Sequence, residues 1–131
     1  MKRQVYALAL LTVSFSGAQA ACSDPPSPKV NWANCRFFDA NLAQKDLSGA
    51  NLKYSTFNNA YMMRTNLSGT TMANTQLESA RMGSANPTNA DLTKADLENA
   101  DLTEANLVGA KFWGADIVVD RSLACYSATR A

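Results

Sequence analysis

The chain has 131 residues, with 12 Lys or Arg, 11 Asp or Glu, three Cys and no His. This length suits a single domain and excludes a multidomain assembly. The near-neutral charge argues against nucleic-acid binding through a strongly basic surface. Without His, the commonest general base and the commonest metal ligand are missing. We therefore expect no cofactor, no metal centre and no nucleic-acid partner.

Residues 1–20 have the three parts of a secretory signal peptide. Lys2 and Arg3 give a positive start, an apolar stretch follows, and Ala-Gln-Ala at 18–20 places small residues where a signal peptidase cleaves. The apolar stretch is shorter than the roughly 20 residues that span a membrane. We therefore expect a periplasmic or secreted protein that is not transmembrane after cleavage. The alternative is that this stretch forms an apolar N-terminal strand of the fold.

Residues 21–29 predict an extended, proline-rich arm. Residues 24–29 read Asp-Pro-Pro-Ser-Pro-Lys, and such a density of proline prevents a helix. Cys22 lies near the start of the arm, where a lipoprotein signal would make it the acylated residue. The preceding Gln-Ala-Ala lacks the large aliphatic residue that such signals usually carry, so a lipid anchor at Cys22 is kept as an alternative.

A period of five residues runs through positions 30–119. From Trp32 to Ile117, every fifth residue is large and apolar at 17 of 18 positions. Alanine fills 11 of the 18 positions two residues earlier, and Asn or Asp fills 11 of the 18 one residue earlier. Five residues advance a helix by about 500° and reverse the face of a flat strand. The chain must therefore turn a corner every five residues to point the apolar residues at one axis.

This pattern resembles the pentapeptide-repeat family, whose unit is Ala-(Asp/Asn)-Leu-X-X. The cleanest stretch is residues 90–102, which read ADLTKADLENADL, and the resemblance covers residues 30–119 without a phase slip. It implies an all-β fold, a right-handed, four-sided parallel β-helix in which four pentapeptides make one coil. Eighteen units then give about four and a half coils, and strands about 4.8 Å apart make a stack about 20 Å tall.

Three departures from the repeat carry expectations of their own. Lys45 occupies an alanine position in the first coil, where its amine is expected to extend out to solvent. Pro87 replaces a central leucine and removes one donor of the backbone ladder, so we expect a local bend or altered turn. The pattern stops after residue 119, and residues 120–131 are expected to cap the last coil, with Leu123 and Tyr126 as plugs.

An exported protein meets an oxidising compartment, in which disulfides persist. Cys35 lies in the first coil and Cys125 follows the last, about 20 Å away along the stack, whereas bridged Cα atoms lie about 4.4–6.8 Å apart. Cys22 is thirteen residues from Cys35 and belongs to the flexible arm. We therefore predict a disulfide between Cys22 and Cys35 that clamps the N-terminal cap. Cys125 is then free or pairs between molecules.

The sequence offers few of the side-chain combinations that catalysis requires, so we expect that the protein is not an enzyme and has no catalytic residue. A serine or cysteine nucleophile lacks a His base. The carboxylates of Asp91, Asp96, Asp101 and Asp116 fall in the Asn/Asp position of the repeat. There they are expected to bond turn backbone rather than to converge on a substrate.

Outward positions that break the small-polar rule mark a candidate protein-binding patch, formed by Tyr61, Met63, Arg64 and Arg81. Tyr, Met and Arg are enriched in interfaces. The structural alternative is an ordinary stack across coils, with a cation–π contact and an ion pair to Asp101. Phe38, Tyr54 and Trp113 also break the pattern, and because they lie near the ends we expect caps to cover them.

The sequence therefore predicts a non-catalytic, exported β-helical scaffold or binding module of the periplasm or cell envelope. Its partner would be a protein, an envelope component or a second copy in a homodimer. The alternative comes from the family resemblance: some members are cytoplasmic, DNA-mimicking proteins that interact with the topoisomerase DNA gyrase. Those members have an acidic surface and a long rod, whereas this chain has few coils and, without residues 1–20, would carry 10 basic and 11 acidic side chains.

Overall fold

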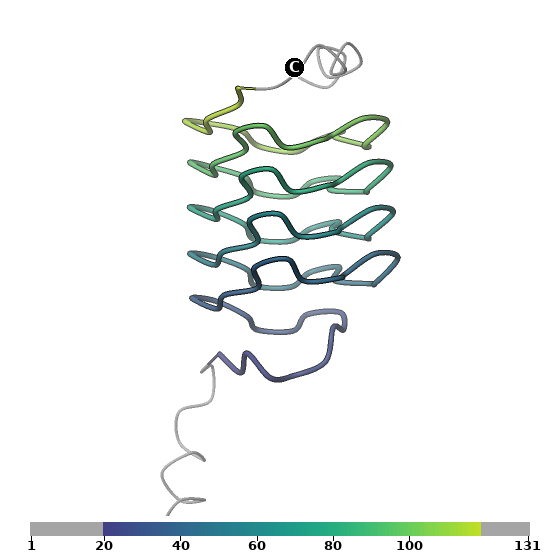
Figure 1. The fold of residues 1–131 in the computed structure, drawn as a ribbon, viewed down its shortest axis with the longest axis vertical. Helices are drawn as coiled ribbons and strands as arrows, with labels where there is room; N and C mark the ends of the chain where they lie inside the picture. The colour runs from purple at the N-terminus through teal and green to yellow at the C-terminus, as the bar shows by residue number, and fades with distance from the viewer. Residues whose placement is uncertain (1–19, 119–131) are drawn as a thin grey trace, which may run out of the picture.

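The computed structural model describes residues 20–118, which wind into a four-sided stack of coils (Figure 1). All β-bridges in this range are parallel and join residues twenty positions apart, from Asn31 with Asn51 to Asp96 with Asp116. The range contains no helix, and its extended structure consists of single-residue bridges between short turns. The predicted four-sided parallel β-helix is therefore confirmed. No helix within this part of the chain is long and apolar enough to cross a membrane.

Each corner of the β-helix is a tight turn with a left-handed residue. Every fifth residue from Lys29 to Gly114 has a positive φ, and fourteen of these eighteen corner residues are not glycine. In the first coil, the backbone N–H of Cys35 donates to the carbonyl of Trp32 at 3.2 Å, and the corner residue Asn34 has φ 62°. A positive φ at the third position of such a turn is typical of type II. These turns supply the corners that the five-residue period requires.

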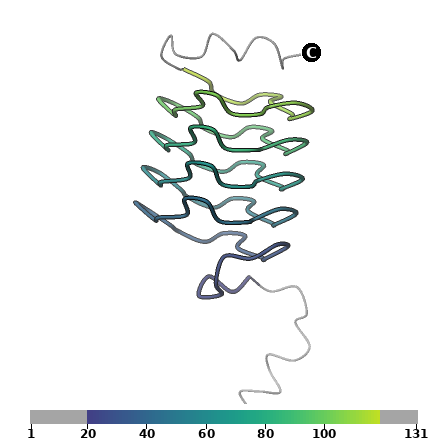
Figure 2. The ribbon, with the colours of Figure 1, turned by 90° about the vertical axis from the view of Figure 1, so that its right-hand side faces the viewer.

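The coils are joined by backbone hydrogen bonds along the stack. Figure 2 shows the stacked coils from the side. Pro87 interrupts this ladder because it has no N–H to donate to the next coil. The bonds on either side remain, from Asn89 N–H to Val108 O and from Asn106 N–H to Ala85 O, both 2.9 Å. The corner after Pro87 also keeps its shape, with φ 58° at Asn89. The expected altered turn at Pro87 is therefore wrong, and the cost is confined to one lost donor.

The core is the column of large apolar residues along the axis. Phe57, Met62 and Leu97 are fully buried, as are most of their equivalents in the middle coils. Where Thr replaces the inward-pointing alanine, its hydroxyl donates to a backbone carbonyl: Thr65 and Thr75 bond Leu42 and Leu52 of the coil below, at 2.7 and 2.9 Å. Thr70 bonds Leu67 of its own coil at 2.8 Å. No buried side-chain nitrogen or oxygen in residues 20–118 lacks a hydrogen-bond partner. Each coil therefore buries its apolar residues only against its neighbours.

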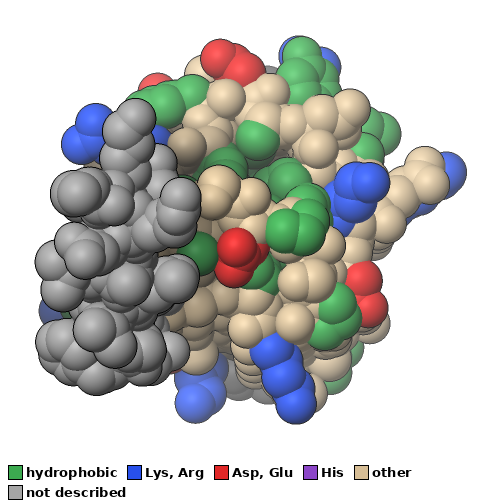
Figure 3. Space-filling model, turned by 90° about the horizontal axis from the view of Figure 1, so that it is seen from below, with side chains coloured by type: hydrophobic (Ala, Val, Ile, Leu, Met, Phe, Trp, Pro, Cys, Tyr) green, Lys and Arg blue, Asp and Glu red, His purple; other side chains and the backbone are tan. Residues whose placement is uncertain are grey.

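The N-terminal end is closed by the arm. A disulfide joins Cys22 to Cys35, with Cα atoms 5.5 Å apart, and this is the pairing expected from the sequence. The indole N–H of Trp32 donates to the carbonyl of Asp24 at 3.2 Å, so the arm lies against the first coil. Lys45 is exposed, as expected for its place in the first coil. Seen from this end, Lys and Arg side chains stand around the rim (Figure 3).

At the C-terminal end of residues 20–118, the apolar side chains are less well buried. Phe112 and Ile117 occupy core positions but are only partly buried, and the side chain of Trp113 is 79% exposed. The residues predicted to cap this end, 120–131 with Leu123, Cys125 and Tyr126, lie outside the described residues, as do residues 1–19 of the predicted signal peptide.

Candidate functional site

The carboxylates of the repeat bond the turns, as predicted. The side-chain oxygens of Asp91, Asp96 and Asp101 accept the backbone N–H two residues further on, at 3.1, 3.0 and 2.9 Å. Bonded to the turns in this way, these carboxylates do not converge on a shared point as an acid–base pair would. Within residues 20–118, no group of three or more His, Cys, Asp or Glu side chains could hold a metal ion.

Hydrogen bonding keeps two of these carboxylates ionised. The Thr103 hydroxyl donates to Asp101 at 2.5 Å, and this bond, with the Thr103 N–H and the nearby charge of Arg81, lowers the pKa of Asp101. The Thr93 hydroxyl does the same for Asp91 and lowers its pKa below the ordinary 3.8. A carboxyl with a lowered pKa is a poor general acid or base near neutral pH. These aspartates therefore act as structural acceptors.

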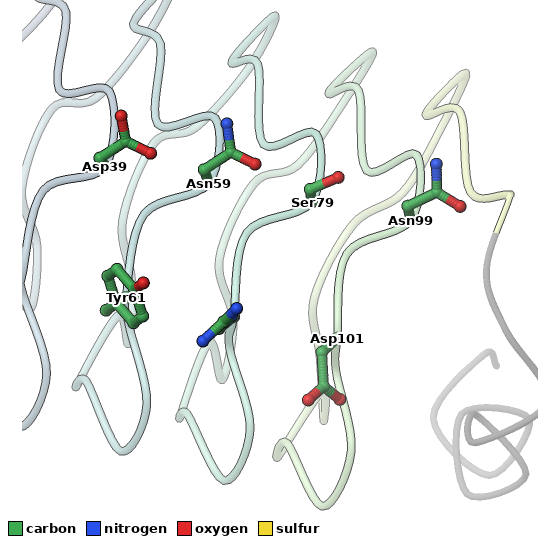
Figure 4. Close-up of a pocket in the computed structure, with 7 residues that line it drawn as sticks. Asp39, Asn59, Tyr61, Ser79, Asn99 and Asp101 are labelled. Carbon is green, nitrogen blue, oxygen red and sulfur yellow. The ribbon is translucent and has the colours of Figure 1, made fainter.

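The first candidate surface is a shallow groove of about 460 Å³, which we call the Arg81 groove. It lies between a row of corner residues and a row of bridge residues (Figure 4). The groove is lined by Asp39, Asn59, Tyr61, Ser79, Arg81, Asn99 and Asp101. The structure thus brings together Tyr61 and Arg81 of the predicted patch.

Three side chains of the Arg81 groove, those of Tyr61, Arg81 and Asp101, interact with one another across the coils. The Arg81 guanidinium lies over the ring of Tyr61, 4.8 Å from its centroid. On its other side, Arg81 pairs in the ladder with Asp101, whose pKa it helps to lower. The cation–π contact of the structural alternative is therefore present, and the charge of Arg81 acts on Asp101. The guanidinium of Arg81 is therefore already engaged, whereas no hydrogen bond or ion pair within residues 20–118 involves the carboxylate of Asp39 on the same groove.

The other two residues of the predicted patch lie on the turn that follows Tyr61. Met63 is 49% exposed, and Arg64 is a corner residue with φ 58°. Neither lines the Arg81 groove. A protein-binding role for Tyr61, Met63, Arg64 and Arg81 stays a prediction.

A second groove, of about 570 Å³, lies at the preceding corner of the coils, and we call it the Arg36 groove. Its lining comes from three successive coils and consists of Asn34, Arg36, Phe38, Tyr54, Thr56, Asn74 and Gln76. Phe38 and Tyr54 are 54% and 60% exposed. The expected covering of Phe38 and Tyr54 by the N-terminal cap is therefore wrong, because the arm closes the end of the stack and leaves its sides open. The residues expected to cover Trp113 lie outside the described residues.

Comparison with known proteins establishes the family. The pentapeptide repeat region family matches residues 30–107, more than half of the 131 residues. The chain therefore belongs to the pentapeptide-repeat family, whose fold is a right-handed, four-sided β-helix. Proteins of this family are in general not enzymes. The search among curated proteins gives no match.

Several solved structures share the fold. HetL, a pentapeptide repeat protein involved in heterocyst differentiation regulation from the cyanobacterium Nostoc sp. strain PCC 7120, is 28% identical, with a TM-score of 0.56. The match covers 70% of this chain and 47% of HetL, so the chain spans about half the length of HetL. The pentapeptide repeat protein alr5209 from Nostoc PCC 7120 is 33% identical over 72% of each chain, with a TM-score of 0.43. QnrB1, a plasmid-mediated fluoroquinolone resistance protein, is 16% identical over 70% of this chain and 65% of its own, with a TM-score of 0.44.

Proposed function

We propose that this protein is an exported, non-catalytic β-helical binding module of the periplasm or cell envelope. The observation that carries the proposal is the disulfide between Cys22 and Cys35. Disulfides persist in exported proteins and are rare in the reducing cytosol. The bond also begins two residues after the predicted cleavage site, so the mature chain would start directly at its own clamp. Two independent features of the N-terminal region therefore agree on export.

The same disulfide argues against a lipid anchor at Cys22. Acylation of a lipoprotein uses the thiol of its first cysteine, and in this structure the Cys22 sulfur is bonded to that of Cys35. A lipid on Cys22 would thus leave the buried Cys35 without its partner and the arm without its covalent tie. The module is therefore proposed as a free protein rather than a membrane-anchored one.

A cytoplasmic, DNA-mimicking interaction with the topoisomerase DNA gyrase is the alternative. Mimicry of DNA needs a continuous acidic stripe, because DNA carries regularly spaced negative charge. The outward column of the second face begins with Arg36, continues through Thr56 and Gln76, and is acidic only at Asp96 and Asp116. A column of mixed sign does not favour this alternative over the exported module.

The test is the intact mass of the protein in each cell fraction, measured with and without reduction and alkylation. We expect a periplasmic or secreted species that starts at Ala21 and needs reduction before Cys22 and Cys35 can be alkylated. A full-length, reduced protein in the cytoplasm would contradict the proposal and favour the gyrase alternative. An added lipid mass on Cys22 would contradict the free form of the module.

A further inference from the structure

The two grooves differ in whether their arginine already has a partner. In the Arg81 groove, the guanidinium, the ring and the carboxylate partner one another. In the Arg36 groove, no hydrogen bond or ion pair within residues 20–118 involves the guanidinium of Arg36 or the side-chain amides of Asn34 and Asn74. Among its polar side chains, only Thr56 and Gln76 bond each other, at 3.0 Å. The Arg36 groove therefore keeps its binding capacity for a ligand.

Tyr54 is a second indication of a binding role, because its backbone conformation is unfavourable for an aromatic residue and should lower the stability of the fold. It is a corner residue with φ 59°, a conformation that suits Asn and Gly and disfavours bulky side chains. Asn34 and Asn74 occupy the equivalent corners one coil below and one coil above. The ring of Tyr54 is 60% exposed and thus gains little from burial. Neither the backbone nor the core accounts for an aromatic residue at this corner.

The positive charge of the Arg36 groove favours a negatively charged ligand. Arg36 is the only charged residue among the groove's lining side chains, and no carboxylate lines it. An unpaired guanidinium binds a carboxylate through two parallel hydrogen bonds. A nucleic acid would require several cations along one path, and this groove offers one. The expected ligand therefore carries a carboxylate but no dense array of charge.

The shape of the groove favours a saccharide chain over a peptide. It crosses three coils, a distance of about 10 Å along the stack, which suits a short oligosaccharide. The amides of Asn34 and Asn74 each offer a donor and an acceptor, as sugar hydroxyls do, and the two aromatic rings offer flat apolar faces. The backbone of these coils is already bonded within the ladder, so no free strand edge is left for an added peptide.

We propose that the Arg36 groove binds an acidic saccharide chain. Arg36 pairs with a carboxylate of the ligand, Phe38 and Tyr54 contact its sugar rings, and the neighbouring amides bond its hydroxyls. The inference deepens the proposed function, because it gives the binding module a ligand class. It is tested by ligand binding to the purified protein in the form that cells produce, so its failure and the failure of the export proposal are distinguishable.

The first experiment is calorimetric titration with three probes of matched length: a galacturonate hexamer, a neutral glucose hexamer and a hexaglutamate peptide. We expect saturable binding of the galacturonate hexamer, with the glucose hexamer at least about tenfold weaker because it lacks the carboxylate. Equal affinity for the glucose hexamer overturns the role of Arg36. Equal or tighter binding of hexaglutamate overturns the saccharide in favour of an acidic peptide, and no saturable binding of the galacturonate hexamer overturns the site.

The second experiment uses variants that the fold already accepts in the same columns. Arg36→Gln, Phe38→Asn and Tyr54→Asn each introduce the residue type found one or two coils further along, at Gln76, Asn58 and Asn74. Arg36→Gln is expected to weaken galacturonate binding about ten- to a hundredfold, and each aromatic replacement about tenfold.

Matched changes in the Arg81 groove serve as controls. Arg81→Gln and Tyr61→Asn remove the same groups from the other groove and are expected to leave galacturonate binding unchanged. Thermal unfolding of every variant checks that the coils remain folded. Wild-type affinity in Arg36→Gln, or an equal loss in Arg81→Gln, would overturn the assignment to the Arg36 groove.

Discussion

The two ends of the described β-helix differ in how far the apolar side chains of their terminal coils are covered. At the N-terminal end, Trp32 is 2% exposed, its ring lies 4.4 Å from that of Phe37, and a disulfide ties the arm across the first coil. At the C-terminal end, Phe112 occupies the same column as Trp32 yet is only partly buried, and Trp113 is largely exposed. Within the described residues, the same repeat position is thus fully buried at one end and only partly buried at the other.

The difference shows that the repeat alone does not make an end stable. A coil buries its apolar residues only against its neighbours, so a terminal coil lacks half of its contacts unless something else supplies them. At the N-terminal end, the arm and the disulfide supply them. The stability of a coil should therefore depend strongly on its position in the stack. Two of the four predictions below test this dependence, and two test contributions of single residues within a coil.

The largest effect is expected from removing a phenylalanine ring in the middle of the stack. Phe57 is fully buried and stacks on Phe37, with ring centroids 5.2 Å apart. Phe57→Ala should lower the free energy of unfolding by about 3–5 kcal/mol, and Phe112→Ala by less than half of that. Chemical denaturation measures both. Phe57→Leu, which introduces the residue type of Leu77 in the same column, keeps the test open should Phe57→Ala fail to fold. Equal losses at the two positions would contradict the dependence on position.

Removal of the disulfide should open the N-terminal end alone. The bond closes a loop of thirteen residues, which corresponds to about 3 kcal/mol in the loop-entropy model. Cys22→Ser should therefore lower the free energy of unfolding by up to about 3 kcal/mol and expose the arm to proteolysis. Ser23→Ala, a change at the neighbouring exposed residue, is the control. Cleavage of the arm at the wild-type rate in Cys22→Ser would show that the clamp is not needed.

A small gain in stability is expected from relieving the corner at Tyr54. Tyr54→Asn keeps φ 59° with a residue that tolerates it, so the free energy of unfolding should rise by about 0.5–1 kcal/mol. The reverse change at the next coil, Asn74→Tyr, should cost a similar amount. Thermal melting of the two variants tests this pair. A destabilised Tyr54→Asn would mean that the ring stabilises the fold. The argument that Tyr54 is present to bind a ligand would then fail.

The smallest effect is a pH dependence of the free energy of unfolding. Asp46 in the first coil also has a lowered pKa, through hydrogen bonds from Ser48, but it is fully exposed. Asp91 and Asp101, both in the fourth coil, have pKa values lowered from 3.8 by hydrogen bonds from Thr93 and Thr103. A carboxyl with a lowered pKa in the folded state stabilises the fold above its unfolded pKa, and this contribution is lost as the pH falls through the folded value. The loss should be well below about 1 kcal/mol per group, because both carboxylates lie at the surface. Denaturation of Asp101→Asn at pH 7 and below pH 3.8 measures it, and an unchanged pH dependence in this variant would contradict the assignment.

The fold could be predicted from the sequence because a large apolar residue recurs at every fifth position. The period of five predicted the corners and the axial core from Trp32 to Ile117, and the resemblance to the pentapeptide-repeat family implied the twenty-residue coil. It also predicted the stack of Tyr61, Arg81 and Asp101, since residues twenty positions apart must be neighbours. The cysteine pairing followed from the same geometry.

The Arg36 groove was missed because its signal is spread over three coils and two columns. Phe38 and Tyr54 were recognised as off-pattern, but only the folded arm shows that it closes the end of the stack and leaves them exposed. The corner column itself was also overlooked, although its frequent Asn and Gly residues are typical of positive φ. Pro87 was judged by its missing donor alone, whereas the bonds on both sides hold the coil in place.

Native-state hydrogen exchange of the oxidised and the reduced protein tests most directly whether position in the stack and the disulfide decide the stability of each coil. The account predicts strong amide protection in the middle coils, intermediate protection of residues 30–49 in the oxidised protein and weak protection of residues 110–118. Reduction should lower protection in residues 30–49 and leave the middle coils unchanged. Uniform protection along the stack, or a first coil indifferent to reduction, would contradict the account.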